Sequence, residues 1–317
     1  MPVYHKPVME AEVLGVLEPS PGKVIIDGTV GEGGHSRLIG PRIKPGGLLI
    51  GIDRDRLVLE EARRRIEETG SDFRLYHGSY SRMRGFLSES GKEKADGVLL
   101  DLGFSMRHIR ASGRGFSFMK DEVLDMRYDT SSGVPAYRWL SEAEERDIRD
   151  VIRKYGQDKR ASRIAKEIKK EADKGPVMTS RRLAAAVSRA VKSRTRRNPA
   201  TRTFQALRIH VNRELDELET GLREALLSLE KGGVLAVITY HSLEDRAVKR
   251  FMAGYTGRCR CPSGIPECRC SASDKVPLVS FPGVSGSAPD AGEISENPSA
   301  RSARLRVCRI ETPWVAG

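Results

Sequence analysis

The chain has 317 residues, of which 31% are charged and 38% are hydrophobic. This length accommodates one large α/β domain with an insertion, and no apolar run reaches membrane-spanning length. The N-terminus lacks the basic-then-apolar pattern of a secretory signal, so we expect a cytoplasmic protein without a membrane partner. Lys and Arg exceed Asp and Glu by 55 to 43, giving a formal charge of +12. This surplus favours a polyanionic partner; a basic protein without such a partner is the alternative.

The most informative stretch of the sequence is residues 24–36. Three apolar residues predict a short strand, and four glycines in the next seven-residue turn predict a sharp bend that leads into a helix. Because glycine has no Cβ atom, such a turn lets a ligand lie against the main chain. The pattern predicts a ligand-binding turn, with a purely structural turn as the alternative.

The residues around this turn narrow the class of ligand. The turn lacks the Gly-Lys-Ser/Thr ending of a phosphate-binding loop, and its glycines do not follow the dinucleotide spacing Gly-x-Gly-x-x-Gly. A second apolar strand, residues 48–52, ends in Asp53, which follows Gly31 by 22 residues. At this distance an acidic residue meets the ribose hydroxyls in a βαβ unit. The sequence therefore predicts an adenosine-type ligand and disfavours a triphosphate.

The remaining elements alternate in the way that is typical of a parallel sheet with right-handed crossovers. Before the interruption we expect a lid or edge helix at 9–17, a surface helix at 55–68 and strands at 73–77 and 97–103. After it we expect a helix with its apolar stripe at 204–229, which ends at Gly232-Gly233, and a buried strand at 234–240. The chain then continues with an irregular segment at 254–300 and an antiparallel edge strand at 304–310. The predicted fold class is therefore α/β with a Rossmann-like parallel sheet.

The interruption is helical. No strand pattern is present from about residue 134 to 197, where we expect helices near 148–155, 158–174 and 179–192. Ser141-x-x-Glu144 matches a capping box for the first of them. We therefore expect an inserted all-helical domain at 111–199, which divides the α/β domain into 1–110 and 200–317.

Polar clusters follow five of the predicted strands. They are residues 27–36, 53–55, 77–80, 101–105 and 241–246. Because ligands bind beyond the carboxyl ends of the strands in an open parallel sheet, these clusters are expected to converge on one crevice. A single residue such as Asp55 is more readily explained as part of a solvated loop.

Several of these blocks resemble the MraW-type methyltransferases. They are His5-Lys6-Pro7-Val8, Asp27-Gly28-Thr29-x-Gly31-x-Gly33-Gly34-His35-Ser36, Asp101-Leu102-Gly103, Gly113-Arg114-Gly115-Phe116-Ser117-Phe118, Leu124-Asp125-Met126-Arg127-Tyr128, the Pro199–Ile209 block and His241-Ser242-Leu243-Glu244-Asp245-Arg246. The resemblance runs from about residue 5 to 310. It implies a class I methyltransferase fold that uses S-adenosylmethionine to methylate the exocyclic N4 amine of a cytidine in the decoding (P-site) region of 16S ribosomal RNA. The resemblance also implies that this RNA is methylated within the small ribosomal subunit.

The same resemblance implies a set of site residues. Cofactor contacts fall on Gly33, Gly34, His35, Asp53, Tyr80, Asp101 and His108. In this arrangement Asp53 holds the ribose hydroxyls and Tyr80 lies beside the adenine. Charge-assisted hydrogen bonds to a carboxylate contribute about 1.5 to 3 kcal/mol.

The chemistry of the implied substrate singles out two residues. The lone pair of a cytosine amine is delocalised into the ring, so catalysis has to come from alignment and from acceptors for the amine hydrogens. Asp101 is the candidate for orienting the amine. His241 is the second candidate, as a proton acceptor or phosphate ligand, and a structural histidine bonded to Glu244 or Asp245 is the alternative.

A basic run follows in the helical region. Residues 174–213 contain eleven Lys or Arg and no Asp or Glu, with Arg194, Arg196 and Arg197 close together. We interpret the insertion as the RNA-binding element, with a solvated charged face as the alternative. Three nearby aromatic residues, Phe116, Phe118 and Tyr128, are candidates either for stacking on an extruded base or for core packing.

The cysteines leave open whether the chain binds a structural zinc. Cys259-x-Cys261 and Cys268-x-Cys270 lie in a Gly/Pro-rich loop. Four close thiols in a reducing compartment favour a structural zinc over disulfides. The spacing is nevertheless tighter than the usual Cys-x-x-Cys of zinc sites.

Two other functions compete with the methyltransferase. An RNA-binding assembly factor that keeps the fold without turnover predicts a damaged cofactor turn, yet Gly31, Gly33, Asp53 and Asp101 are all present. A nicotinamide-dependent dehydrogenase is disfavoured by the glycine spacing.

Overall fold

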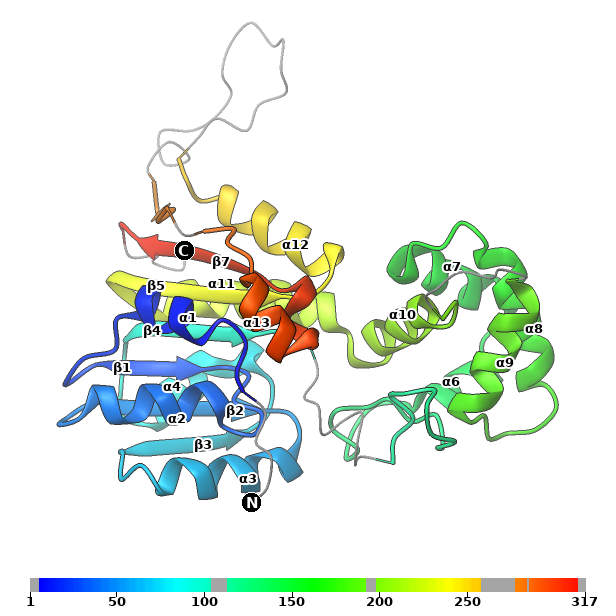
Figure 1. Ribbon diagram of the computed structural model, residues 1–317, viewed down its shortest axis with the longest axis horizontal. Helices are drawn as coiled ribbons and strands as arrows, with labels where there is room; N and C mark the ends of the chain where they lie inside the picture. Colours follow the sequence, from blue (N-terminus) through cyan, green and yellow to red (C-terminus); the bar gives the residue numbers. More distant parts are fainter. Residues whose placement is uncertain (1–5, 104–112, 192–197, 258–276, 284, 313–317) are drawn as a thin grey trace, which may run out of the picture. The chain divides into compact units, whose positions relative to one another are not determined.

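The computed structural model describes residues 6–103, 113–191, 198–257, 277–283 and 285–312. The chain divides into two compact units, one formed by Met1–Gly103 with Leu215–Gly317 and the other by Phe104–Glu214. In Figure 1 the second unit is the group of green helices. It extends beyond the expected insertion 111–199 at both ends, and each unit has its own hydrophobic core.

The first unit contains a seven-stranded sheet. Its strands are β1 Val24–Asp27, β2 Leu48–Asp53, β3 Phe73–His77, β4 Ala95–Asp101, β5 Leu229–Thr239, β6 Val279–Ser280 and β7 Arg304–Ile310, in the order β3-β2-β1-β4-β5-β7-β6. The first five strands are parallel, which confirms the predicted Rossmann-like sheet. All five therefore end at the same edge of the sheet, where the polar clusters were expected.

The far side of the sheet differs in two details from the prediction. Strand β7 is antiparallel to β5, as expected, but it is not the edge, because the two-residue β6 pairs with its outer side. The helix before β5 ends at Ser228 and not at Gly232-Gly233, since β5 already begins at Leu229. Both glycines lie in that strand, where the pairing with β4 changes register between Ala95 and Gly97.

Helices cover both faces of this sheet. Helices α4 (Met83–Glu89), α11 (Glu214–Ser228) and α12 (Ser242–Ala253) pack on one face, and α1 (Glu10–Leu17), α2 (Gly34–Ile39) and α3 (Arg56–Glu67) pack on the other. Successive strand residues point to opposite faces, so Ile26 and Ile25 of β1 enter different cores. Helix α1 contacts β4 and β5, so it covers the central strands and is neither a lid nor an edge helix.

The helix predicted at 204–229 is in fact two helices. Helix α10 (Thr201–Asn212) ends where Arg213 adopts a left-handed φ of 51°, and α11 begins at Glu214. The Asn212 side chain donates to the Met126 carbonyl (2.7 Å) and accepts the Tyr128 N–H (2.8 Å). These contacts with a distant loop fix the break, which no local pattern of apolar residues reveals.

The second unit is helical, as expected. Its helices are α6 (Ala136–Glu142), α7 (Glu145–Gly156), α8 (Ala161–Ala172), α9 (Ser180–Ala190) and α10, which share one core. The predicted capping box is wrong: Ser141 lies inside α6 and its Oγ donates to the Arg138 carbonyl (2.8 Å). Glu144 precedes α7 without a side-chain cap, because the chain turns there between two helices.

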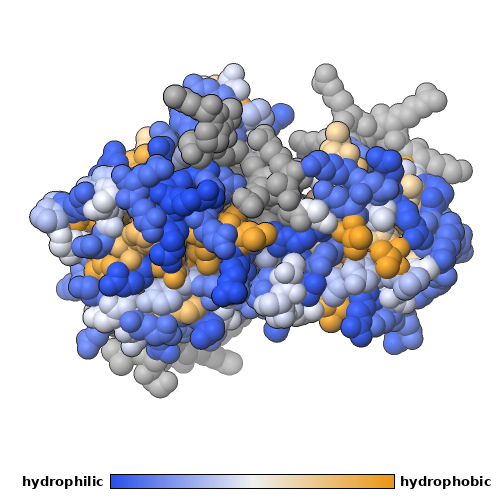
Figure 2. All heavy atoms as spheres, turned by 90° about the horizontal axis from the view of Figure 1, so that it is seen from below, coloured by the Kyte–Doolittle hydropathy of each residue, from blue (hydrophilic) through white to orange (hydrophobic). Residues whose placement is uncertain are grey.

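Hydrophilic side chains cover most of the surface seen in Figure 2, with apolar side chains in small groups between them. Among the residues that the structure describes, the exposed large apolar ones are Leu57, Met119, Val123, Val134, Val177 and Phe281. None of the helices in the described part of the chain combines the length and apolar composition needed to cross a bilayer.

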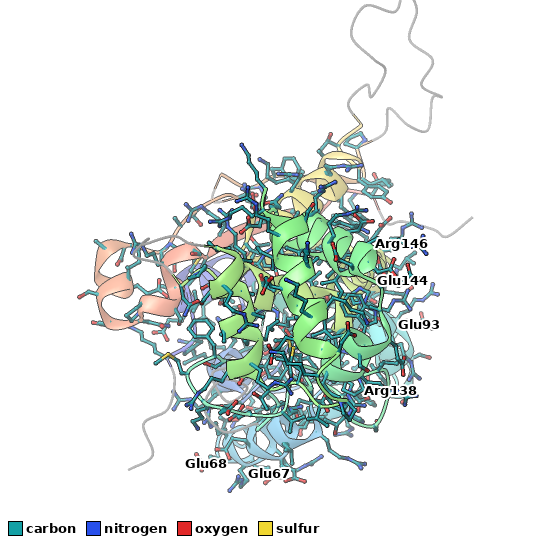
Figure 3. The ribbon with its side chains drawn as sticks, turned by 90° about the vertical axis from the view of Figure 1, so that its right-hand side faces the viewer. Glu67, Glu68, Glu93, Arg138, Glu144 and Arg146 are labelled. Atoms are coloured by element: carbon teal, nitrogen blue, oxygen red, sulfur yellow. The ribbon has the colours of Figure 1, made fainter. Side chains whose placement is uncertain are left out.

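An ionic cluster around Glu171 joins α8 to α9. Its carboxylate lies 2.8 Å from Lys174 Nζ, 3.0 Å from Arg182 Nε and 2.8 Å from an Arg189 guanidinium nitrogen. Hydrogen bonds from these cations, the one from Lys174 first, lower the pKa of Glu171 to about 2. The Glu171 side chain is only 9% exposed, which sets this cluster apart from the solvated pairs around Arg138 and Arg146 that project outward in Figure 3.

We predict that Glu171→Gln destabilises the protein by about 1 to 3 kcal/mol at pH 7, because three cations lose their common anion. The folded-state pKa lies below the ordinary value of 4.5, so this stabilisation is complete above pH 4.5 and is lost as the pH falls toward 2. Urea unfolding at pH 7 and at pH 3 measures both effects.

The matched control is Glu142→Gln, whose carboxylate pairs with Arg138 on the surface at 2.9 Å. Both partners are more than 60% exposed, so we expect the free energy of unfolding to change much less than in Glu171→Gln. Equal losses in the two variants would contradict the special role of Glu171.

Candidate active site at the strand ends

The glycine-rich turn connects β1 to α2 and crosses the ends of both neighbouring strands. The Gly28 N–H donates to the Leu99 carbonyl of β4 (2.9 Å), and the Val30 N–H donates to the Ile52 carbonyl of β2 (3.0 Å). Gly33 has a φ of +81°, which L side chains rarely adopt. A Cβ on Gly28 would lie 2.6 Å from Leu100 Cδ2, so any larger residue here requires the buried Leu100 side chain to move.

Asp53 ties the end of β2 to this turn. Its Oδ2 accepts the Gly31 N–H (2.9 Å) and its Oδ1 accepts the Asp55 N–H (2.8 Å). Both carboxylate oxygens of Asp53 therefore act as hydrogen-bond acceptors beside the turn, which is the chemistry that a ribose diol requires. Asp55 is not part of a solvated loop as expected, because it is 3% exposed and its carboxylate caps α3 through the Leu57 N–H (3.0 Å).

A buried polar cluster lies beneath the turn. Asp27 is 1% exposed and accepts hydrogen bonds from Ser36 Oγ (2.7 Å) and the Thr29 N–H (3.3 Å). Burial raises the pKa of Asp27 to about 6, although nearby His35 and the Ser36 hydroxyl act in the opposite direction. Burial likewise lowers the pKa of His35, so at neutral pH the cluster holds a neutral imidazole.

His35 connects this cluster to the end of β4. Its Nδ1 lies 3.8 Å from Asp101 Oδ2, and its Nε2 lies 2.9 Å from the Val8 carbonyl oxygen. Because a carbonyl only accepts, Nε2 carries the hydrogen. Asp101 in turn accepts the Tyr240 hydroxyl (2.7 Å), and its own N–H donates to Thr29 Oγ1 (2.6 Å).

Contacts with the C-terminal part of the chain hold the segment before α1 against this cluster. Glu293 of α13 (Ala291–Glu296) accepts the Met9 N–H at 2.7 Å, and Glu296 forms an ion pair with Lys6 at 3.2 Å. Pro7 lies against Gly34, where a Cβ would be 3.4 Å from the proline ring. The Lys6-Pro7-Val8 segment therefore supports His35 from outside, a role that the sequence did not reveal.

Tyr80 lies in a gap left by two glycines. It begins the short 3-10 helix Tyr80–Arg82 after β3. A Cβ on Gly28 would come within 3.1 Å of the Tyr80 Cβ, and a Cβ on Gly221 of α11 would come within 2.2 Å of its ring. This places Tyr80 beside the glycine-rich turn, and Gly221 leaves room for its ring, a packing role that sequence reasoning missed.

His241 has a structural role in the fold. It is the N-cap of α12, where its Nδ1 accepts the Glu244 N–H (3.3 Å) and the Glu244 carboxylate accepts the His241 N–H (3.2 Å). This is a capping box, and it agrees with the structural alternative in which His241 bonds to Glu244. A role for His241 as proton acceptor stays a prediction.

Several predicted residues lie outside the described part of the chain. They are His108 in the cofactor set and the four cysteines Cys259, Cys261, Cys268 and Cys270 of the zinc hypothesis. The same holds for Arg194, Arg196 and Arg197. Their assignments stay predictions.

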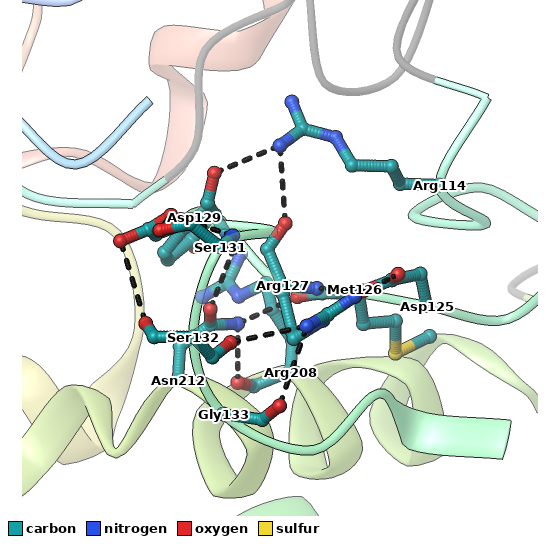
Figure 4. Close-up of polar contacts among 11 residues, drawn as sticks. Arg114, Asp125, Met126, Arg127, Asp129, Ser131, Ser132, Gly133, Arg208 and Asn212 are labelled. Carbon is teal, nitrogen blue, oxygen red and sulfur yellow. Dashed lines mark hydrogen bonds and ion pairs between the residues drawn. The ribbon is translucent and has the colours of Figure 1, made fainter. Parts of the chain in front are cut away.

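The segment that follows Gly113 is a scaffold inside the second unit. Arg114 donates to the carbonyls of Arg127 (3.1 Å) and Tyr128 (2.8 Å), while Arg127 holds Asp125 through two bonds of 2.7 and 2.8 Å, as Figure 4 shows. These contacts hold Met126, whose φ is +61°. The block therefore shapes a loop by bonding its backbone.

The aromatic residues of this loop face the core. Phe116 is 9% exposed and stacks on Tyr128 with ring centroids 5.6 Å apart. Phe118 packs edge-on against Phe204 at 5.5 Å. Core packing therefore accounts for these rings, and the buried face of Phe116 is closed to an extruded base.

The sheet order, the glycine-rich turn after β1 and the acid at the end of β2 define the Rossmann-like fold of class I methyltransferases. The model of the MraW methylase family matches residues 2–311. The chain belongs to this family.

Curated relatives cover nearly the whole chain. The ribosomal RNA small subunit methyltransferase H of Syntrophotalea carbinolica is 46% identical over 308 residues, which is 96% of this chain and 97% of that protein. The proteins of the same name from Ralstonia pickettii strain 12J and Geobacter sulfurreducens are 45% and 43% identical, each over 310 residues and 96% of this chain, and over 96% and 98% of their own lengths.

We predict that Gly221→Ala destabilises the protein by about 1 to 3 kcal/mol, because the new methyl group overlaps the Tyr80 ring. Helix propensity alone would favour alanine by about 1 kcal/mol. The control is Gly85→Ala in α4, where a Cβ meets nothing within 4 Å and a gain of about 0.5 to 1 kcal/mol is expected. Thermal unfolding compares the two, and equal gains would show that the Tyr80 ring yields without cost.

Proposed function

We propose that this protein transfers a methyl group from S-adenosylmethionine to the exocyclic N4 amine of a cytidine in the decoding region of 16S ribosomal RNA, in the cytoplasm and within the small subunit. The membership in the MraW methylase family and the printed names of the relatives support an RNA substrate. The observation that supports the chemistry is the placement of Asp101 beside the glycine-rich turn, with its N–H on Thr29 and its carboxylate on Tyr240.

The residues at the strand ends fit the cofactor. A turn without side chains at Gly28, Gly31 and Gly33 gives a ligand access to the main chain, and Asp53 beside it offers acceptors for ribose hydroxyls. Gly34, His35, Tyr80, Asp101 and His108 complete the proposed set. When bound, S-adenosylmethionine supplies a methyl group on a positively charged sulfur.

The task of the chain's own residues is alignment. Since the cytosine amine is a weak nucleophile, Asp101 contributes by accepting its hydrogen atoms and turning its lone pair toward the methyl group. Once methylated, the nitrogen is strongly acidic and gives up a proton readily, so a strong base is not required. We assign the acceptance of that proton to the carboxylate of Asp101.

We assign RNA binding to the second unit, but not to all of its basic residues. Within the basic run, Lys174, Arg182 and Arg189 pair with acids of α8, and Arg208 pairs with Glu214 at 2.8 Å. These four cations are structural, so phosphate contacts are expected from other members of the run.

The decisive experiment is transfer of a methyl label to small ribosomal subunits from cells that lack this protein. Label in N4-methylated cytidine after nucleoside analysis supports the proposal. Label in another nucleoside, or none, would refute it. Binding of S-adenosylmethionine and RNA without any transfer would instead identify an assembly factor without turnover.

We predict that Asp53→Asn weakens S-adenosylmethionine binding about ten- to hundredfold, the equivalent of losing charge-assisted bonds of about 1.5 to 3 kcal/mol. Titration calorimetry measures this. Asp72→Asn, an equal change in charge at an exposed residue next to β3, is the control and should bind normally. If Asp53→Asn binds S-adenosylmethionine with unaltered affinity, the Asp53 carboxylate does not hold the ribose.

We also predict that replacing Arg194, Arg196 and Arg197 together with glutamine weakens RNA binding and leaves the affinity for S-adenosylmethionine unchanged. The slope of log affinity against log salt should fall by about 0.7 to 0.9 for each phosphate contact removed. Filter binding over a salt series measures the slope.

The control for total charge replaces three exposed arginines of the first unit, Arg42, Arg56 and Arg74. It should leave the slope nearly unchanged. If both triple variants reduce the slope equally, net charge and not this segment determines RNA binding.

A further inference from the structure

Tyr240 lies one strand away from Asp101, at the end of β5. The parallel register pairs Asp101 with Ile238, and the Leu102 N–H donates to the Ile238 carbonyl (3.0 Å). Tyr240 follows Ile238 by two residues and therefore lies just past the end of the paired strands. From there its hydroxyl reaches Asp101 Oδ1 at 2.7 Å.

Tyr240 is itself held in place. Its N–H donates to Glu244 Oε2 (2.9 Å), and Glu244 is 3% exposed and belongs to the capping box of α12. On its other side the ring lies against Gly103, where a Cβ would be 3.5 Å from Tyr240 Cδ2. Gly103 has a φ of +106°, a conformation suited to glycine. The hydroxyl therefore has a defined position, set by elements outside β4.

The neighbouring His35 cannot replace this donor. Its Nε2 hydrogen is used on the Val8 carbonyl, so in the neutral ring Nδ1 carries a lone pair. That lone pair lies 3.8 Å from Asp101 Oδ2, so it offers no hydrogen to the carboxylate. The Tyr240 hydroxyl, in contrast, donates a charge-assisted hydrogen bond to Asp101.

We propose that Tyr240 is a positioning residue that fixes the orientation of the Asp101 carboxylate toward the amine of the substrate. The proposal rests on the proposed function, in which Asp101 orients that amine. With Oδ1 bound to Tyr240 and the main chain anchored on Thr29, the carboxylate has little freedom to rotate. A small rotation of this group would misalign the amine, and such errors are costly in reaction rate.

The test is Tyr240→Phe, which keeps the ring and removes only the hydroxyl. Under saturating RNA and S-adenosylmethionine, we expect kcat for methyl transfer to fall about ten- to hundredfold, the loss associated with one hydrogen bond to a charged group. The Kd of S-adenosylmethionine and the Tm should stay close to those of the unaltered protein. Tyr76→Phe removes a hydroxyl elsewhere in the same sheet and is the control, with kcat unchanged.

A double-mutant cycle with Asp101→Asn separates positioning from an independent effect. If Tyr240 acts through Asp101, the double variant is no slower than Asp101→Asn alone. If the loss of kcat in the double variant equals the product of the two single losses, the proposal is overturned. A full kcat in Tyr240→Phe would also overturn it, as would a loss of Tm and cofactor affinity with kcat retained. Absence of methyl transfer by the unaltered protein would instead overturn the proposed function.

Discussion

The hydrogen bond from the Gly31 N–H to Asp53 Oδ2 joins the turn after β1 to the end of β2. The turn has no side chains of its own at its glycines, so its shape has to come from such bonds and from the strands beside it. Once this shape is set, α2 begins at Gly34 and brings His35 and Ser36 beneath the turn. This bond, together with those of Gly28 and Val30 to the neighbouring strands, thus shapes the surface offered to a ligand and positions the polar groups below it.

Those polar groups are buried at a cost, which explains why contacts from distant parts of the chain meet here. A buried carboxylate such as Asp27 requires partners, and the Ser36 hydroxyl and the Thr29 N–H supply them. His35 in turn depends on the Val8 carbonyl, and the segment around Val8 is anchored by Glu293. Tyr240 belongs to the same group of contacts, because its hydroxyl donates to Asp101. Burial and the nearby Asp101 raise the pKa of Tyr240 well above its ordinary value, so its hydroxyl keeps its proton.

The parts of this structure that follow local rules could be predicted from the sequence. The parallel strands are runs of apolar residues, and the glycine-rich turn and Asp53 have a characteristic spacing. What could not be predicted depends on contacts between distant residues. Asn212 ends α10 by bonding to Met126, and Gly221 is required only because the Tyr80 ring lies against it. Neither contact can be recognised from the residues that are adjacent in the sequence.

The basic run shows the same limit for electrostatics. Its eleven cations and lack of acids are a property of the linear sequence, but α8 contributes Glu167 and Glu171 from outside the run. Arg189 contacts both of these acids, and Arg208 is buried against Glu214. Since a cation in a partly buried pair contributes mainly to the stability of the fold, the count of basic residues overstates the charge available to a polyanion. The net charge of +12 therefore indicates the sign of the partner, whereas the location of the contact depends on which cations lack acids nearby.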